Sequence, residues 1–332
     1  MADTNERIEV IRLLAEKIRA YYIFPDMAEK ICMGLQKHLE IGDYNDITED
    51  EFFAYTLTVH VQEICHDEHL WIKWHSEPLP DDEETLRLSE EWRQEGQLQA
   101  KIGNYGFHKI ERMAGNVGYV EIRYLHRPSW GGQIAVAAMN FLANTDALII
   151  DLRKCTGGYP GMVSLVSSYL LGEEPVHLSS IYWRDDNVTQ QYWTLPYVPG
   201  PRLDEQPLYI LIGKNTFSGG EGFSYDMQAR KRAVIIGEQT DGGAHPGASY
   251  RLHPHFEAFI PIGNPTHPIT GNNWEGVGVV PDILVSAELA LEAAHKMALE
   301  EIIKKLGKPK PGPLRLLLAE ARAAYKELKK EQ

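Results

Sequence analysis

The sequence predicts an α/β protein that carries a small helical domain at its N-terminus. In residues 1–75, apolar side chains recur every three or four positions, which is the spacing of amphipathic helices. From residue 116, short β-rich apolar runs alternate with helical stretches, as in an α/β domain with buried strands. We expect a helical domain at 1–75, an acidic connecting segment at 76–115, an α/β domain at 116–305, and a linker and helix at 306–332.

Three helices are expected in the first segment. The apolar face of the first helix is formed by Ile8, Ile11, Leu14, Ile18 and Tyr22, and Pro25 ends it. A second helix spans about 27–39 and is closed by Gly42. A third begins near Thr48, with Glu51 three residues later as in a capping box, and runs to about Cys65. A short strand is expected at 70–74.

The connecting segment holds the most acidic stretch of the chain, residues 78–98. A solvated helix or a flexible crossing explains this composition, and a mobile lid over a cleft is the alternative.

Four apolar runs are the expected strands of the α/β domain: VGYVEI at 117–122, ALIIDL at 147–152, PLYILI at 207–212 and AVIIGE at 233–238. Helices are expected between them near 132–142, 162–170 and 222–229. A last helix at 314–330 follows a Pro/Gly break, and its apolar face can bind either the parent domain or a second copy of the chain as a homo-oligomer.

The composition limits the classes of partner that we expect this protein to bind. The chain has 332 residues and a net charge of −14, which disfavours nucleic acid and anionic membranes, because both need a positive field. The 3 cysteines are too few for a disulfide framework or a Cys-rich zinc site. The N-terminus lacks a signal-peptide pattern, and no apolar run approaches the roughly 18 residues of a membrane helix. We therefore expect a cytoplasmic protein without a membrane partner.

Motifs for nucleotides and metals are incomplete. No G-x-G-x-x-G follows a strand, Gly213-Lys214 lacks the rest of a P-loop, and H-E-x-x-H is absent. His66 with His69, or His253 with His255, can pair on a metal, but the sequence shows no third ligand. We expect no metal and no cofactor.

The most informative stretch is PLYILIGKNTFSGGEGFSYDMQA at 207–229. A buried strand ends at Ile212, and Ser218 stands just before a helix that begins near Gly220. The free backbone N–H groups of a first helical turn can stabilise a developing oxyanion, and glycines at 219, 220 and 222 let a substrate approach the backbone. The alternative is that Ser218 is only an N-cap.

A second glycine corner, ALIIDLRKCTGGYPG at 147–161, repeats the pattern of strand, turn and helix. Gly157 and Gly158 can provide one wall of an oxyanion hole, and Asp151 can pair with Arg153 to brace the turn. A plain helix start with helpful glycines is the alternative. Farther on, Glu275 is a carboxylate among apolar neighbours, so it needs a partner.

Taken together, these segments resemble peptidase family S41, whose members include C-terminal (tail-specific) processing proteases, the tricorn protease core and interphotoreceptor retinoid-binding protein modules. The matching marks are D-L-R-x-x-x-G-G at 151–158, T-x-S-G-G-E at 216–221, G-E-Q-T-D-G-G-A at 237–244 and W-E-G-V-G-V-x-P-D at 274–282. The helical N-terminus leading into D-x-H-L at 67–70 looks most like the retinoid-binding-module branch. The resemblance implies a ClpP/crotonase-like catalytic domain, and the segments leave no room for a PDZ module.

The resemblance also implies a site. Ser218 matches the nucleophile, His69 the base and Glu275 the orienting acid. The oxyanion hole would use Gly219 with Gly157 or Gly158. Tail-specific proteases typically use a lysine, but the matching place reads Gly242-Gly243-Ala244, so a Ser/Lys dyad is not expected.

Two further residues have open roles. Glu68 stands where the tricorn-like branch has a helper serine, and His245 is a second candidate base. The aromatic side chains Tyr159, Trp183, Tyr192 and Trp193 either line a substrate cleft or belong to the core.

The expected function is a serine peptidase that acts on a peptide or protein substrate. The alternatives are a noncatalytic binder of peptides or hydrophobic ligands with the same fold, and a nonpeptide hydrolase or acyl transferase that uses the same serine.

Overall fold

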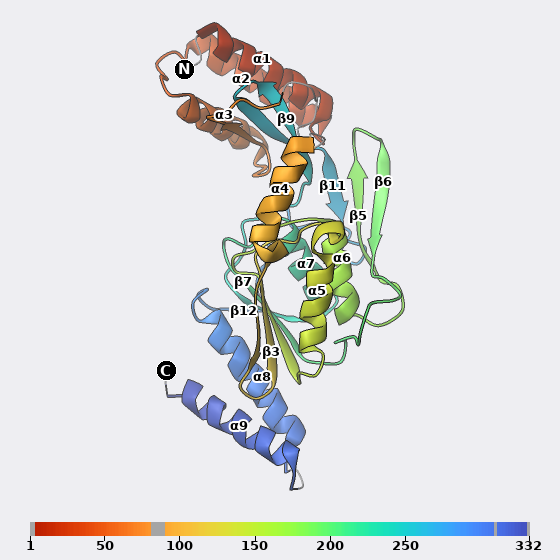
Figure 1. The fold of residues 1–332 in the computed structure, drawn as a ribbon. Coiled ribbons are helices and arrows are strands. Elements are labelled where there is room, and N and C mark those ends of the chain that lie inside the picture. The colour runs from red at the N-terminus through yellow and green to blue at the C-terminus, as the bar shows by residue number, and fades with distance from the viewer. Residues whose placement is uncertain (1–3, 81–89, 309–310, 331–332) are drawn as a thin grey trace. The chain divides into compact units, whose positions relative to one another are not determined.

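A computed structural model describes residues 4–80, 90–308 and 311–330 of the chain (Figure 1). The chain divides into two compact units. The first unit comprises Met1–Leu98, Ser180–Gln190 and Gly243–Thr266, and the second comprises Gln99–Ser179, Gln191–Gly242 and His267–Gln332. Two later segments therefore return to the N-terminal unit.

The first unit is a three-helix layer on a small antiparallel sheet. Its helices are α1 (Thr4–Tyr21), α2 (Pro25–Ile41) and α3 (Asp50–Cys65), which lie beside β9 in Figure 1. Its strands, in the order β1-β10-β9, are β1 (Trp71–Trp74), β10 (Phe256–Pro261) and β9 (Gly247–His253). Helix residues such as Phe53 and Leu57 share one buried core with Phe256 and Ile260 of β10. The predicted helices and the strand near 70–74 are present, and their apolar faces are covered by strands from much later in the sequence.

The second unit is built on a six-stranded sheet with the order β12-β8-β7-β4-β3-β2. The strands are β2 (Phe107–Met113), β3 (Val117–Ile122), β4 (Ala147–Asp151), β7 (Leu208–Ile212), β8 (Val234–Gly237) and β12 (Ile283–Leu284). All neighbouring pairs are parallel except β2 and β3, which are antiparallel. The four apolar runs expected as strands form β3, β4, β7 and β8, which confirms the α/β class.

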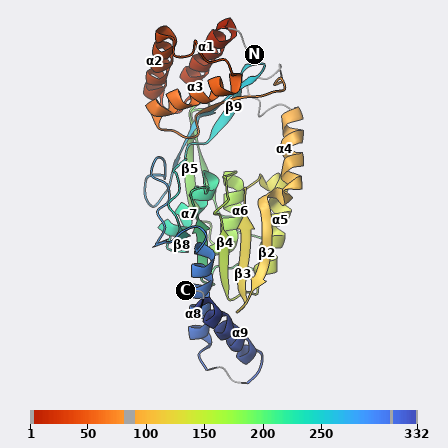
Figure 2. The same ribbon diagram turned by 90° about the vertical axis from the view of Figure 1, so that its left-hand side faces the viewer.

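Helices cover both faces of this sheet (Figure 2). Helices α5 (Pro128–Leu142), α6 (Pro160–Leu170) and α7 (Gly219–Ala229) pack with Leu148 and Ile150 of β4. The intervening residue Ile149 belongs instead to the core under α8 (Ala290–Leu306). This alternation follows from the two-residue repeat of a strand, and each buried isoleucine contributes roughly 1.5–3 kcal/mol.

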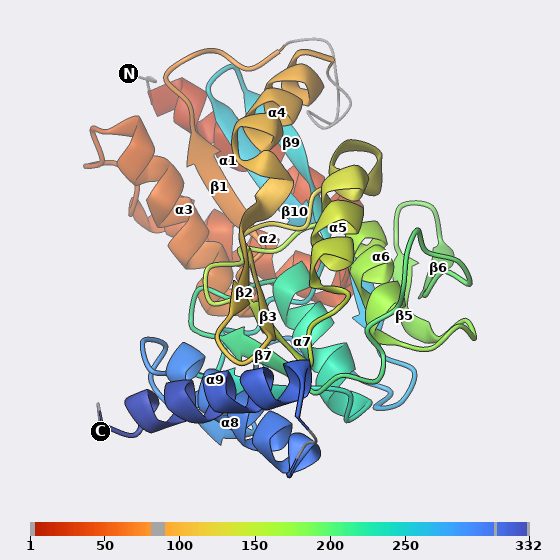
Figure 3. The ribbon, with the colours of Figure 1, turned by 60° about the horizontal axis from the view of Figure 1, so that its bottom comes forward.

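The last helix, α9 (Pro313–Leu328), packs against α8 of its own unit (Figure 3). Its residues Leu318 and Ala321 are buried at 6% and 0% exposure. Within the single chain, the part of this face around Leu318 and Ala321 therefore packs on the parent domain.

The remaining elements are a third sheet and two helices that precede β2. A further sheet has the order β11-β5-β6, formed by β5 (His177–Trp183), β6 (Val188–Trp193) and β11 (Gly263–Thr266). Helix α4 (Glu90–Ile102) and the short 3-10 helix η2 (Asn104–Gly106) precede β2. Residues 81–89 of the acidic stretch, where a lid was considered, lie outside the described residues.

Across the described ranges, we find no helix that combines the length and the apolar character needed to cross a membrane.

Candidate active site

The corner that carries Ser218 is tied to the end of the neighbouring strand. After β7 ends at Ile212, the amide of Gly213 donates to the hydroxyl of Thr216 (2.9 Å), which in turn donates to the carbonyl of Leu152 (2.8 Å). The amide of Phe217 donates to the carbonyl of Cys155 at 2.9 Å. Thr216 in the T-x-S motif therefore fastens the serine turn to the turn that follows β4.

Ser218 has a strained backbone that a buried glutamate holds in place. Its φ of 51° and ψ of −117° are unusual for a residue with a side chain. Such residues cost about 1–3 kcal/mol and persist only where the surroundings impose them. The Glu221 side chain is fully buried and accepts the Ser218 amide at 2.7 Å through Oε2.

The second oxygen of Glu221 reaches another turn. Oε1 accepts the Thr240 hydroxyl at 2.6 Å and the Gly242 amide at 2.9 Å. The same Thr240 oxygen accepts the amide of Val279 at 2.7 Å. Glu221 thus fixes both the serine corner and the turn that follows β8. Sequence reasoning missed this role, although the spacing Ser-x-x-Glu of a capping box was a usable signal.

Two glycine peptides lie directly against the serine. A Cβ on Gly157 would come within 2.9 Å of the Ser218 Cβ, and one on Gly219 would come within 2.8 Å of the Gly158 carbonyl oxygen. Gly157 and Gly158 have φ angles of 119° and 138°, which disfavour any side chain. In the part of the chain that the structure describes, the amides of Gly158 and Gly219 donate no hydrogen bond to the protein. The predicted set of Ser218 with Gly157, Gly158 and Gly219 is therefore brought together.

The glycine corner is braced as expected from the sequence. Asp151 and Arg153 form an ion pair at 2.6 Å, and this contact raises the pKa of the arginine. Tyr119 donates its hydroxyl to Asp151 at 2.8 Å. Behind the corner, burial raises the pKa of Cys155 to about 12, so its thiol does not compete as a nucleophile at neutral pH.

Glu275 belongs to a loop that packs on the same corner. Its amide donates to Asn273 Oδ1 at 2.9 Å, and the next amide, of Gly276, donates to the Gly242 carbonyl at 2.7 Å. A Cβ on Gly222 in α7 would come within 2.7 Å of the Trp274 ring. Glu275 therefore stands between Trp274, which packs on α7, and Gly276, which is hydrogen-bonded to Gly242.

The candidate bases lie in the first unit, where one buried aspartate organises them. Asp67 Oδ2 lies 2.8 Å from Nδ1 of His245, and both side chains are at most 6% exposed. Asp67 Oδ1 accepts the amide of His69 at 3.0 Å, and Tyr22 donates its hydroxyl to Asp67 at 3.2 Å. Burial raises the pKa of Tyr22, so this hydroxyl keeps its proton.

His69 is held as a neutral imidazole. Burial lowers its pKa to about 4, with His245 adding to the shift and Asp67 opposing it. Glu68, considered as a replacement for a helper serine, is exposed, whereas its neighbour Asp67 is buried. Sequence reasoning missed Asp67, because its partner His245 stands 178 positions away.

The helices of the second unit direct their N-termini to one edge of the sheet. Strands β3, β4 and β7 are parallel, and each is followed by a helix, α5, α6 or α7. The helices therefore begin at the carboxyl edge, where Ser218 lies. A helix N-terminus carries a partial positive charge and favours anions, so this edge suits a developing oxyanion.

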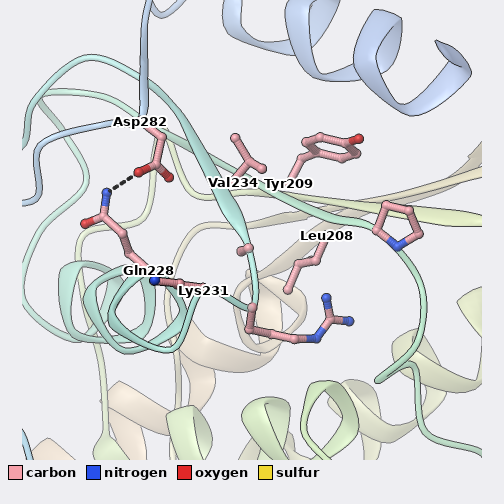
Figure 4. A pocket seen from close by; sticks show the side chains of 9 residues that line it. Leu208, Tyr209, Gln228, Lys231, Val234 and Asp282 are labelled. Carbon is pink, nitrogen blue, oxygen red and sulfur yellow. Dashed lines mark hydrogen bonds between the residues drawn. The ribbon is translucent and has the colours of Figure 1, made fainter. Parts of the chain in front are cut away.

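A separate cavity of about 370 Å³ lies at the opposite edge, where β7 and β8 begin (Figure 4). In it, Gln228 donates to Asp282 at 3.0 Å, and the other Asp282 oxygen accepts the Ile235 amide at 2.8 Å. The Asp282 carboxylate is therefore occupied by hydrogen bonds within the protein. The cavity lies where β7 and β8 begin, whereas Ser218 lies beyond the end of β7.

Two family profiles match the chain. The one described as peptidase family S41 matches residues 116–285, and the one described as the N-terminal domain of Peptidase_S41 in eukaryotic IRBP matches residues 4–104. A carboxy-terminal-processing protease of Bartonella bacilliformis is 27% identical over 192 residues, which are 54% of this chain and 41% of that protein. The chain spans less than half the length of the curated relatives it matches.

Two solved structures share the fold. A lipoprotein from Streptococcus agalactiae superposes with a TM-score of 0.55 at 15% identity, covering 89% of this chain and 96% of that one. The tricorn protease superposes with a TM-score of 0.54 at 12% identity, covering 97% of this chain and 37% of that one. At such low identity the likeness concerns the fold and not the chemistry.

Proposed function

Because the chain belongs to peptidase family S41, we propose that it is a serine peptidase in which Ser218 attacks the carbonyl carbon of a peptide bond. The observation that carries this proposal is the clamped geometry of Ser218. A strained serine at a helix N-terminus, held by a buried glutamate beside two unused glycine amides, is costly for a protein that only needs a helix cap.

The oxyanion hole is proposed to use the amides of Gly219 and Gly158. The Ser218 amide is taken by Glu221, whereas these two amides are available beside the serine. As the Ser218 oxygen bonds to the carbonyl carbon, the carbonyl oxygen gains negative charge and accepts both N–H groups. One such donor is worth about 3 kcal/mol of barrier in a well-formed site.

His69 is proposed as the base and Glu275 as the acid that orients it. His69 is neutral in the folded protein, so it can accept the proton that Ser218 loses during the attack. The resulting imidazolium would then pass this proton to the leaving amine as the C–N bond breaks. A water molecule, activated by the same base, would hydrolyse the acyl-enzyme and restore Ser218.

His245 is the second candidate for the base. Its contact with Asp67 is the kind that fixes an imidazole tautomer and stabilises the imidazolium. The two histidines are separated by comparing His69→Ala with His245→Ala. If His69 is the base, its loss lowers kcat by at least about 100-fold. Full turnover by His69→Ala together with an inactive His245→Ala would reverse the assignment.

The proposed activity is tested by incubating the protein with a mixture of synthetic peptides and detecting new termini by mass spectrometry. The Ser218→Ala variant is the control for a contaminating protease. We expect cleavage products from the wild type that are lost with Ser218→Ala. Identical product patterns from the two proteins would contradict the proposal.

A further inference from the structure

Arg127 is a half-buried cation that forms no ion pair with any residue the structure describes. Its guanidinium lies over the Tyr159 ring at 4.4 Å and near the Trp130 ring at 6.0 Å, and it donates to the Tyr159 hydroxyl at 3.3 Å. Considering the described residues only, its Nε is buried without a hydrogen-bond partner, and no carboxylate lies within ion-pair distance of it. A partly buried charge without a counterion loses part of its hydration, so this arrangement favours an anionic ligand.

Other arginines of the same unit are satisfied differently. Arg153 holds Asp151 at 2.6 Å, and Arg230 holds Asp226 at 3.0 Å. Arg232 uses its guanidinium to bind the carbonyls of Leu170 and Leu203. Arg127 differs from these arginines, because its guanidinium lies against aromatic rings and donates to the Tyr159 hydroxyl at 3.3 Å, whereas theirs bind carboxylates or carbonyls.

The position of Arg127 is next to the serine corner. The segment that leads to it runs beside the glycine turn, because Leu125 donates to the Gly157 carbonyl at 2.8 Å and accepts the Tyr159 amide at 2.7 Å. Tyr159, on which the guanidinium stacks, directly follows Gly158. A peptide whose scissile carbonyl sits on the Gly158 and Gly219 amides would therefore lie close to Tyr159, the residue that Arg127 contacts.

The surroundings of Arg127 add to its attraction for anions. Arg127 is the N-cap of α5 and Tyr159 is the N-cap of α6, and neither helix has an acidic residue in its first turn. The partial positive charges of two helix N-termini therefore add to the positive potential around the guanidinium, which attracts anions.

Burial favours the neutral forms of two aromatic side chains beside Arg127 in the sequence, Tyr124 and His126. Burial raises the pKa of Tyr124 to about 12 and lowers the pKa of His126. These two rings lie 4.5 Å apart, and His126 also faces Trp130 at 6.3 Å. These neutral rings exclude water from the surroundings of the guanidinium, which strengthens its attraction to a negative charge.

We propose that Arg127 binds a carboxylate of the substrate chain, so that the peptidase selects peptides with a negative charge close to the cleaved bond. This inference rests on the proposed serine-peptidase function. The planar guanidinium fork matches a carboxylate, which it can bind through two parallel hydrogen bonds. In a peptide, such a carboxylate comes from the free C-terminus or from an Asp or Glu side chain.

The test compares three N-terminally fluorescein-labelled Ala/Leu hexapeptides: one with a free C-terminus, one with a C-terminal amide, and one amidated with an internal Asp. Binding to the Ser218→Ala protein is measured by fluorescence anisotropy, which needs no turnover. We expect one or both carboxylate peptides to bind better than the uncharged amide. Adding Arg127→Gln should weaken their binding by about 10- to 100-fold and leave the uncharged amide within about threefold.

Arg123→Gln is the matched control, because Arg123 belongs to the same segment but pairs with Glu121 at the surface. If Arg127→Gln weakens binding of the peptide with the free C-terminus, the C-terminal carboxylate is the ligand. If it weakens binding of the peptide with the internal Asp, an acidic side chain is the ligand. Equal binding of all three peptides, or equal losses with Arg123→Gln and Arg127→Gln, would overturn the inference.

A fluorophosphonate, which carries no carboxylate, separates this inference from the proposed function. Labelling of the wild type reports on the serine nucleophile alone, because this probe offers no carboxylate to Arg127. Failure of labelling in the wild type would count against the serine-peptidase function, whereas the anisotropy result decides on Arg127 independently.

Discussion

At the residue scale, the candidate site depends on Glu221 as much as on Ser218. One carboxylate accepts the Ser218 amide, the Thr240 hydroxyl and the Gly242 amide, so its two oxygens serve three donors. The strain of Ser218 is maintained by this contact. The position of Ser218 between a buried strand and a glycine-rich helix start could be predicted from the sequence, because strand, turn and glycines are adjacent in the chain. Asp67 could not be found in this way, since its contact with His245 depends on the folding of distant segments.

Replacing Glu221 with Gln should loosen the serine corner. The glutamine would place an NH2 group where Glu221 has an acceptor oxygen, so at least one donor would lose its partner. The loss of this hydrogen bond costs about 1–3 kcal/mol of folding free energy. We also expect fluorophosphonate labelling of Ser218 to slow by at least about 10-fold. Urea denaturation and labelling rates check this. Glu238→Gln is the control, because this partly exposed glutamate takes no part in the contacts that Glu221 makes. An unchanged labelling rate in Glu221→Gln would argue against the clamp.

Two glycines should respond to alanine in opposite ways. In Gly219→Ala the new Cβ would come within 2.8 Å of the Gly158 carbonyl oxygen, so we expect labelling to fall at least about 10-fold. In Gly132→Ala, inside α5, the nearest atoms are 3.7 Å away, so the helix should gain about 0.5–1 kcal/mol of stability. Thermal denaturation and labelling of both variants measure the contrast. Normal labelling of Gly219→Ala would speak against a close packing of the two glycine peptides.

The lowered pKa of His69 predicts the acidic limb of the pH–rate profile. A protonated His69 cannot accept the serine proton, so activity falls as the pH drops through its pKa. Because burial lowers this pKa to about 4, kcat/KM should persist well below pH 6.5, the ordinary midpoint of a histidine. The profile is measured between pH 4 and 8 within the range where the fold is intact by circular dichroism. An acidic limb centred at pH 6.5 or above would contradict His69 as the base with this pKa.

At the scale of elements, buried strands were predictable and partly exposed ones were not. Strands β4 and β7 are buried along their whole length, so they appear in the sequence as continuous apolar runs. Strand β2, at the sheet edge, reads FHKIERM and alternates irregularly between buried and exposed positions. Its pattern resembles a polar connection, which is why the segment 76–115 was expected only to link the domains.

The docking of α9 on α8 can be measured with two leucines of the same helix. Leu318 is 6% exposed and Leu316 is 75% exposed. We expect Leu318→Ala to cost about 2–4 kcal/mol of stability and Leu316→Ala less than about 0.5 kcal/mol. Urea denaturation of both variants gives the difference. Equal effects would show that α9 does not pack on α8 as described.

At the scale of the whole molecule, the chain returns twice to complete the N-terminal unit. Strands β9 and β10 contribute Tyr250, Phe256 and Ile260 to the same core as the three helices. The sequence predicted these helices from their spacing, but partners of their apolar faces lie about two hundred positions or more away. Such long-range pairing leaves no local trace in the sequence, so the helices alone suggested a self-contained domain.

A fragment of residues 1–98 should therefore be unable to fold alone. Without β9 and β10, apolar residues such as Phe53 and Leu57 lose much of the surface that covers them. We expect weak helicity by circular dichroism and no cooperative thermal transition. The full chain is the control. A sharp transition in the fragment would contradict the composition of this unit.

The identity of the nucleophile is the central claim, and it is tested most directly by mapping a covalent adduct. The full-length protein is treated with a fluorophosphonate, digested and examined by mass spectrometry. We expect a single modified residue, Ser218, and no adduct in Ser218→Ala. A well-folded wild-type protein that forms no adduct, or forms it at another residue, would show that Ser218 is not the nucleophile.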